Sequence, residues 1–336
     1  MNKKLKIWSL IILILLFLLL ATILLALLIG EVNFTFPQLI NILQKQSGIE
    51  YSILTNIRVP RIILGFAVGG ALSISGLILQ AIYRNPLVEP YTLGISGGAA
   101  LAVAIGIVFG LNQMLAGLSL PILGMLGATI SITFIYTISM RRTHLNINSI
   151  LLTGVMISFI TSSAIMFLLA TTTSEKLQSI FFWTMGSLEE PNQILIYLVL
   201  LSSVLGLLIF YYYVNQLNAL RVGESNAKHL GVNTGGVIKI LFIVASVITG
   251  ISVAAVGVIG FVGLIVPHLL RSLIGNDYRI LLISTFLGGG IFLILSDVLA
   301  RTIISPNELP IGVITGMIGG LIFIIAISKS KKLLKF

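Results

Sequence analysis

Long apolar runs, separated by short polar segments, fill most of this 336-residue chain. A run of about 18 or more apolar residues can cross a ~30 Å hydrocarbon core as a helix. Because such runs recur almost throughout, the pattern predicts an all-α polytopic membrane protein with a single transmembrane domain over residues 1–336. The ten predicted spans are 7–29, 60–82, 92–111, 117–140, 147–170, 193–214, 235–257, 259–270, 280–300 and 310–328.

The polar segments between these runs predict surface elements. Thr35 and Pro37 are suited to begin a short surface helix after the first span. Residues 172–192 are polar and amphipathic, and 215–233 form the longest clearly polar loop that follows. The apolar piece 259–270 is brief for a full span and contains a proline, which favours a broken or tilted helix.

The first apolar run has an alternative interpretation as a signal peptide, because the basic sequence MNKKLK precedes it. The stretch from Ile7 to Ile29 exceeds the roughly 7–15 apolar residues of a signal peptide, and no A-x-A cleavage site follows it. We therefore interpret it as the first spanning helix.

Charge patterning sets the expected topology. Only 9% of the residues are charged and the mean hydropathy is +1.12, which soluble domains do not show. Ten crossings place both termini on one side, and the positive-inside rule makes that side the cytoplasm. The net charge of +10 then reflects topology rather than nucleic-acid binding. Five of the 20 basic residues fall outside: Lys45, Arg58, Arg61, Lys176 and Arg301.

The parity of the spans suggests an internal repeat. If the second to fifth and the seventh to tenth spans are two copies of one unit, the copies run in opposite directions. The chain would then contain inverted repeats, a common transporter design. Glycine pairs such as Gly69-Gly70 and Gly97-Gly98 would let the helices approach closely in lipid.

Several kinds of chemistry are missing from the sequence. It has no cysteine, no Walker A loop and no H-E-x-x-H motif, and its three histidines are scattered. We expect no catalytic residues, no metal site and no cofactor bound by this chain. The predicted helix centres carry almost no ionisable residues, which argues against the alternative of a self-contained ion-coupled carrier or channel. Asp297 and Arg301 are spaced for an i,i+4 salt bridge.

Three stretches, in order, resemble the iron-siderophore and cobalamin permease family of type II ABC importers. They are 58–100, which contains RNPLVEP; 223–271, which begins GESNAKHLGVN; and 296–320, which begins SDVLARTIISPNELP. The resemblance implies a homodimer with its pathway on the two-fold axis. It also implies two ATPase subunits that use ATP and Mg²⁺, and an extracytoplasmic substrate-binding protein. An iron-siderophore chelate is the expected cargo, and haem, cobalamin and molybdate-like oxyanions remain alternatives.

The segment GESNAKHLGV has the spacing of a short helical knob flanked by glycines. A charged loop of this kind is otherwise usually just solvated. The resemblance makes the knob the contact with the ATPase. The residues of this predicted coupling site are Gly223, Glu224, Ala227, Lys228, Leu230 and Gly231.

The two prolines of RNPLVEP preclude a continuous helix, and Asn85 can cap the loop. By resemblance, Asn85 and Leu87 form a cytoplasmic gate, with Ile147 and Asn148 as a second constriction. A mildly polar wall suits passage of a bulky ligand, because conduction requires weak binding. Each hydroxyl could instead bond to its own helix backbone. The candidate lining residues are Ser158, Thr161, Ser162, Thr315 and Met317.

Arg58, Arg61 and Arg301 fall on the outer face, where positive charge is disfavoured. The resemblance implies that they receive acidic residues of the binding protein, a role that suits the bidentate guanidinium. Snorkelling to lipid phosphate or local pairing, as with Asp297, is the alternative.

Overall fold

The computed structural model describes residues 3–111, 118–140, 147–190 and 192–329, and within these ranges the regular structure is entirely helical. Seven described helices are long and apolar enough to cross a membrane, and three shorter apolar helices match the remaining predicted spans. The ten are α1 Lys3–Leu28, α4 Val59–Tyr83, α5 Ile95–Val108, α6 Ser119–Met140, α7 Ile147–Thr171, α9 Gln193–Tyr212, α12 Thr234–Val256, α13 Val262–Ile274, α14 Tyr278–Thr302 and α15 Ile311–Lys329.

Shorter helices lie between the spans. They are α2 Phe36–Lys45, α3 Ile49–Ser52, the π-helix η1 Ile53–Arg58, the 3₁₀ helix η2 Pro90–Leu93, α8 Ser174–Met185, α10 Val214–Arg221 and α11 Glu224–His229. The surface helix predicted near Thr35 is confirmed, because Thr35 and Gln38 form a capping box at the start of α2. The polar connection over 215–233 contains two short helices, of which α11 was predicted as the knob and α10 was not.

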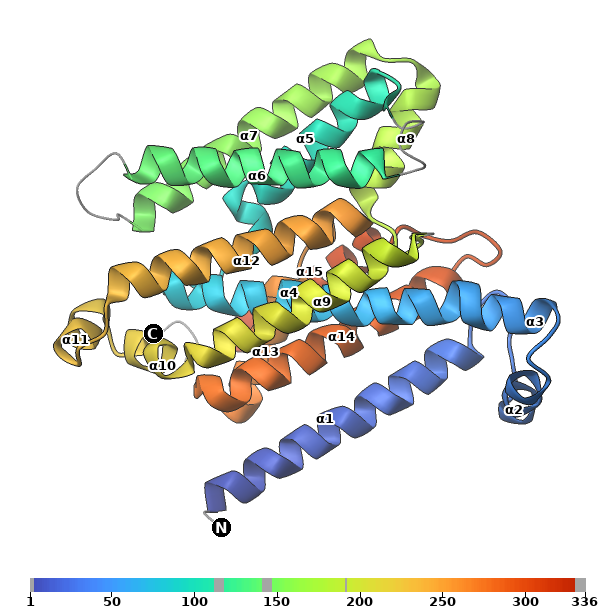
Figure 1. Ribbon diagram of the computed structural model, residues 1–336, viewed down its shortest axis with the longest axis horizontal. Coiled ribbons are helices and arrows are strands. Elements are labelled where there is room, and N and C mark those ends of the chain that lie inside the picture. The colour runs from blue at the N-terminus through green and yellow to red at the C-terminus, as the bar shows by residue number, and fades with distance from the viewer. Residues whose placement is uncertain (1–2, 112–117, 141–146, 191, 330–336) are drawn as a thin grey trace.

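The bundle has two ends, which are formed by different short helices (Figure 1). At one, which we call the α11 end, α10 and α11 lie near the start of α14, and Lys4 of α1 pairs with Asp277, just before α14, at 3.1 Å. At the other, the α2 end, α2 and α3 lie together with the start of α4. The predicted division of basic residues follows these ends: Arg84 contacts α10, whereas Arg61 and Arg301 meet at the opposite end of α4.

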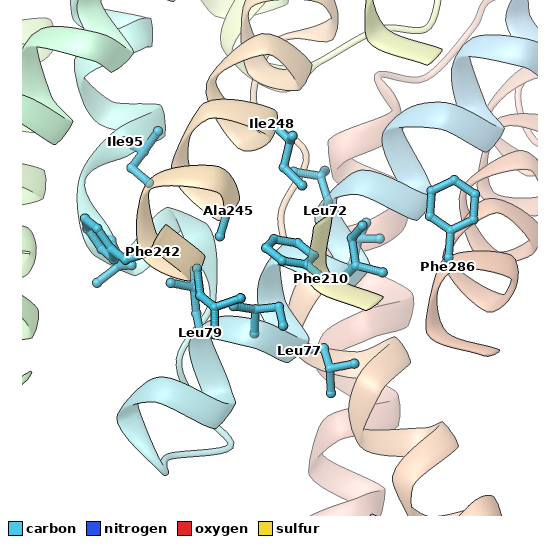
Figure 2. Close-up of a cluster of buried hydrophobic side chains, with 14 of the residues drawn as sticks. Leu72, Leu77, Leu79, Ile95, Phe210, Phe242, Ala245, Ile248 and Phe286 are labelled. Carbon is cyan, nitrogen blue, oxygen red and sulfur yellow. The ribbon is translucent and has the colours of Figure 1, made fainter. Parts of the chain in front are cut away.

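Helix α4 forms the centre of the bundle. It is buried along 89% of its most apolar window, whereas the corresponding value for the peripheral α1 is 17%. Figure 2 shows Leu72 and Leu79 of α4 among side chains from four other helices, including Phe210 of α9 and Phe242 of α12. A helix that is apolar on every face and enclosed by others gains packing on all sides.

The helix packing repeats with the predicted inverted symmetry. Helix α4 packs on α13 and α14, and its counterpart α12 packs on α5 and α6. Both long crossings have small residues where the backbones approach. A Cβ at Gly69 of α4 would overlap the Gly289 carbonyl of α14, and a Cβ at Gly124 of α6 would lie 3.1 Å from the Ala254 Cα of α12.

Each half also contains one short helix that begins inside the bundle. Helix α5 has 14 residues and α13 has 13, so each is only about 20 Å long. Lys176 of α8 donates to the Val108 carbonyl at the end of α5, and Arg221 of α10 donates to the Asn276 carbonyl just after α13. Since each helix ends at a surface, its start lies within the bundle. Left-handed residues, Gly94 and Phe261, precede these two starts.

Candidate coupling, gate and mouth sites

The loop between α4 and α5 carries the predicted gate residues. Arg84, in the left-handed conformation, ends α4. The Asn85 side chain then accepts a hydrogen bond from the Leu87 amide at 2.9 Å, which closes a tight turn. Leu87 is 48% exposed at the tip of this turn. Its exposure leaves it available for a contact beyond this chain. The side chains of Ile147 and Asn148, at the start of α7, lie outside the described residues.

The far end of this loop is bonded to the other half of the molecule. A carboxylate oxygen of Glu89 accepts from the Phe261 amide at 3.2 Å, and the Tyr91 hydroxyl accepts from the Ile259 amide at 2.9 Å. The loop between α12 and α13 supplies both amides. Sequence reasoning missed Glu89 and Tyr91, although the Glu-Pro pair at the end of RNPLVEP marks the start of a helical turn.

The predicted knob is confirmed as a compact helix. Gly223 and Gly231 flank α11 and both have positive φ, a conformation that favours glycine. Ala227 is fully buried beneath the helix, and the amide of Val232 donates to its carbonyl at 3.0 Å. Leu230 is 71% exposed. The knob therefore presents an apolar side chain outward from a rigid base.

Charged groups brace this knob internally. Lys228 pairs with Glu224 at 2.9 Å one turn away, and the Thr234 hydroxyl at the start of α12 donates to the same carboxylate at 3.3 Å. The hydrogen bond from Lys228 is the main cause that lowers the Glu224 pKa below its ordinary value. Arg84 of the gate loop donates to the Leu220 carbonyl at 3.3 Å, which connects the gate loop directly to α10.

The predicted lining residues divide into two groups. Ser162 and Met317 are exposed, and Ser158 is partly buried. The prediction was wrong for Thr161 and Thr315, whose side chains are 6% and 0% exposed within this chain. Their hydroxyls donate to carbonyls of their own helices, α7 and α15, as the alternative interpretation expected.

A buried charge network closes the α2 end around Arg61. Its guanidinium is bidentate to Glu308, with N–O distances of 3.1 and 2.9 Å, and also donates to Asp297 at 2.8 Å and Glu189 at 2.9 Å. Asp297 pairs in turn with Arg301 at 3.0 Å, so the predicted i,i+4 pair is confirmed but lies buried. The network connects α4, α14 and the loops that follow α8 and α14.

Arg58 is likewise used inside the chain. It donates to the carbonyls of Leu27 and Val32, just at and beyond the end of α1, and stacks 4.4 Å from the Phe34 ring centroid. The prediction of three outward-facing arginines needs correction: Arg58, Arg61 and Arg301 are 3%, 6% and 5% exposed. Desolvated guanidinium groups need partners, and internal acceptors provide them. Within the Arg61 network, Glu189 has the most exposed side chain, at 62%.

An all-helical bundle with inverted halves and no self-contained ATP motif has the architecture of a transporter's membrane permease. The chain belongs to the FecCD transport family, whose model matches residues 18–329. It is an ABC importer permease, and it is 39% identical to the hemin transport system permease protein HmuU of Yersinia pestis over 84% of this chain and 85% of that protein.

Two further similarities span the same fold. The vitamin B12 import system permease protein BtuC of Salmonella paratyphi A is 37% identical, over 82% of this chain and 83% of that protein. A solved structure described as an inward-facing transporter of the metal-chelate type superposes with a TM-score of 0.86 at 30% identity. The match covers 95% of this chain and 99% of that one. The resemblance inferred from the sequence motifs is therefore confirmed at the level of the family.

Proposed function

We propose that this permease imports an iron-siderophore-type chelate as a homodimer, with both termini in the cytoplasm. Two ATPase subunits would bind at the α11 end, and a substrate-binding protein would deliver the cargo at the α2 end. The observation that carries this proposal is the knob α11, braced on Ala227 and adjacent, through Arg84 and the Leu220 carbonyl, to the gate loop. Binding energy at the knob could thus act on a gate.

The assignment of the cargo rests on the uncharged side chains of the candidate pathway, which are compatible with a bulky chelate. The exposed residues among the candidate lining set, Ser162 and Met317, are uncharged. Such a wall would not hold a large ligand tightly enough to stop its passage. Haem is the second candidate, because the hemin permease of Yersinia pestis is 39% identical to this chain.

Docking of the binding protein would require an exchange of carboxylates at the α2 end. Glu189 and Glu308 already occupy the Arg61 guanidinium, but their side chains are 62% and 32% exposed. Acidic side chains of a binding protein could displace these two, whereas Asp297, only 4% exposed, would stay in place. The affinity for the binding protein would fall with rising salt, because the new ion pairs with Arg61 would form at a partly solvent-exposed surface, where salt screens them.

The test is transport in proteoliposomes that contain the permease, its ATPase and its binding protein. A ferric hydroxamate siderophore, haemin and cyanocobalamin would be offered separately. We expect ATP-dependent accumulation of the siderophore complex above that of the other two. Preferential accumulation of haemin would transfer the assignment to the second candidate. Equal accumulation in vesicles that lack the ATPase would instead favour a self-contained carrier.

A matched pair of variants tests the coupling element. Glu224→Arg should reverse a charge on the surface of α11 and reduce uptake per ATP hydrolysed by about tenfold, because losing about 1–2 kcal/mol of contact with the ATPase corresponds to that range. Glu175→Arg makes the same change on α8, at the opposite end of the bundle, and should leave the ratio unchanged. Equal ratios for Glu224→Arg and the parent would remove α11 from the coupling site.

A further inference from the structure

The gate loop, residues 84–94, is fixed at two places that belong to different parts of the molecule. At its start, Arg84 donates to the Leu220 carbonyl of α10. Near its end, Glu89 accepts from the Phe261 amide and Tyr91 accepts from the Ile259 amide. Asn85 and Leu87 lie between these anchors. Any displacement of α10 relative to the α12–α13 loop must therefore be taken up by the turn that holds Leu87.

The second anchor is unusual in its chemistry. Glu89 is partly buried inside the bundle, and among the described residues no Lys, Arg or His lies within ion-pair distance of it. An ionisable residue at such depth is costly and generally has a function. Its carboxylate accepts from the Phe261 amide just before α13, and Glu89 is also the N-cap residue of η2, where its carbonyl accepts from the Thr92 amide at 3.2 Å.

The acceptor role explains why a side chain is needed here. The break between α12 and α13 leaves amides without helical partners, and such groups must be satisfied away from water. Phe261 also has a left-handed backbone (φ 70°), which a non-glycine residue adopts only when its surroundings hold it. Pro90 packs against the same place, because a Cβ at Gly263 would lie 3.1 Å from its Cδ.

We propose that Arg84 and Glu89 are positioning residues that make the gate loop a strut between the coupling elements and the α12–α13 break. Arg84 carries motion of α10 and α11 into the loop, and Glu89 holds the opposite end still. The turn at Asn85 and Leu87 moves because only one of its two anchors moves. This proposal rests on the proposed function for the meaning of that motion, but the two anchors themselves can be tested without any partner.

The first experiment uses the full chain alone in lipid nanodiscs. Leu87→Cys introduces the only cysteine of the chain, so a nitroxide can be attached there specifically. Its continuous-wave spectrum reports mobility of the turn. We expect Arg84→Gln and Glu89→Ala each to raise the ratio of mobile to immobile label about fivefold, the effect of losing one net hydrogen bond. Glu89→Gln keeps an acceptor oxygen for the Phe261 amide and should restore the parent spectrum.

Arg279→Gln is the matched control. Arg279 also makes a side-chain bond at the α11 end, to Asn215 at 3.2 Å, but it does not contact the gate loop. Its substitution should leave the label unchanged. If Glu89→Ala and Arg84→Gln also leave the spectrum unchanged, or if Glu89→Gln behaves like Glu89→Ala, the two-anchor arrangement is refuted.

The second experiment adds the ATPase and measures disulfide formation between Leu87→Cys side chains of two copies, with and without ATP. We expect Arg84→Gln to reduce the ATP-dependent change in crosslinking about fivefold while hydrolysis continues. A normal ATP-dependent change in this variant would overturn the transmission role of Arg84. If the parent itself shows no change with ATP, the proposed gate fails, and the nitroxide spectra still decide whether the anchors exist.

Discussion

The two ends of the bundle hold their charges in different ways. At the α2 end, Arg61 meets three carboxylates and is 6% exposed, and its partners come from three separate segments. At the α11 end each ion pair joins only two side chains and is exposed to solvent. The Lys228 and Glu224 side chains, for example, are 61% and 40% exposed.

This contrast separates a rigid region from an adjustable one. Removing one partner of a buried, hydrogen-bonded charge leaves the others without compensation and is strongly destabilising. An exposed pair contributes little, because water and salt replace it readily. The α2 end should therefore behave as one fixed unit, and the α11 end can shift at small cost when a partner binds there.

The largest effect is expected for Arg61→Ala, which leaves Asp297 buried without its main donor. We expect the free energy of unfolding to fall by about 3–5 kcal/mol. Unfolding in mixed dodecyl maltoside and SDS micelles would measure it. The double variant Arg61→Met with Asp297→Asn removes both charges and should recover part of the loss. A loss below about 1 kcal/mol in the single variant would contradict a fixed α2 end.

A smaller effect is expected for Arg58→Ala, which removes the donor to two carbonyls at the end of α1. Hydrogen bonds from charged groups contribute about 1.5–3 kcal/mol, so we expect a loss in that range. The loosening should be local, because α1 packs mainly on α14. Hydrogen exchange of residues 25–34 should accelerate while that of α12 stays the same. Uniform acceleration would mean that α1 is not a separate unit.

At the opposite end, Lys228→Ala should change the free energy of unfolding by less than about 0.5 kcal/mol, as exposed i,i+4 pairs do. The same micelle titration applies. A loss comparable to that of Arg61→Ala would abolish the contrast between the ends. Coupling to the ATPase is a separate measurement and does not enter this comparison.

The smallest effect concerns acid pH at the start of α14. Burial alone would raise the Asp277 pKa, but hydrogen bonds from the Arg279 amide, Lys4 and Asn218 outweigh it and lower the pKa below 3.8. A lowered pKa in the folded state stabilises at pH values above 3.8 and loses that contribution as pH falls further. The contact with α1 should therefore weaken only in strong acid.

Trp8 can report this change, because the Lys4 ammonium lies 4.8 Å from its ring centroid. In a Trp183→Phe background, Trp8 fluorescence should shift as pH falls below about 4. Asp277→Asn should remove the pH dependence. A shift that persists in Asp277→Asn would have another cause.

Much of this fold follows from local pattern. The ten apolar runs predicted ten helices because only a helix satisfies its own backbone in lipid. For the knob α11, the flanking glycines and the residue spacing were compatible with a short helix, and the resemblance to the permease family favoured that interpretation over a solvated loop. The start of α5 was less predictable: η2 and the left-handed Gly94 precede it, so the helix begins at Ile95 rather than at residue 92.

The charge partners could not be predicted, because they are distant in sequence. Arg61 is 128 residues from Glu189 and 247 from Glu308, and no local signal connects them. The burial of Thr161 and Thr315 could not be predicted from the sequence for another reason. Helices α7 and α15 are apolar on nearly every face, so periodicity does not indicate which face is covered.

The bonds between the two interrupted regions also constrain how the protein is made. Glu89 and Tyr91 leave the ribosome well before their partners, Phe261 and Ile259, which lie 172 and 168 residues further along the chain. Until the second half has been inserted, a carboxylate and a phenol in the first half lack their final donors. Insertion of the seventh and eighth spans therefore supplies the last hydrogen-bond donors of the first half. Either repeat inserted by itself would lack these bonds.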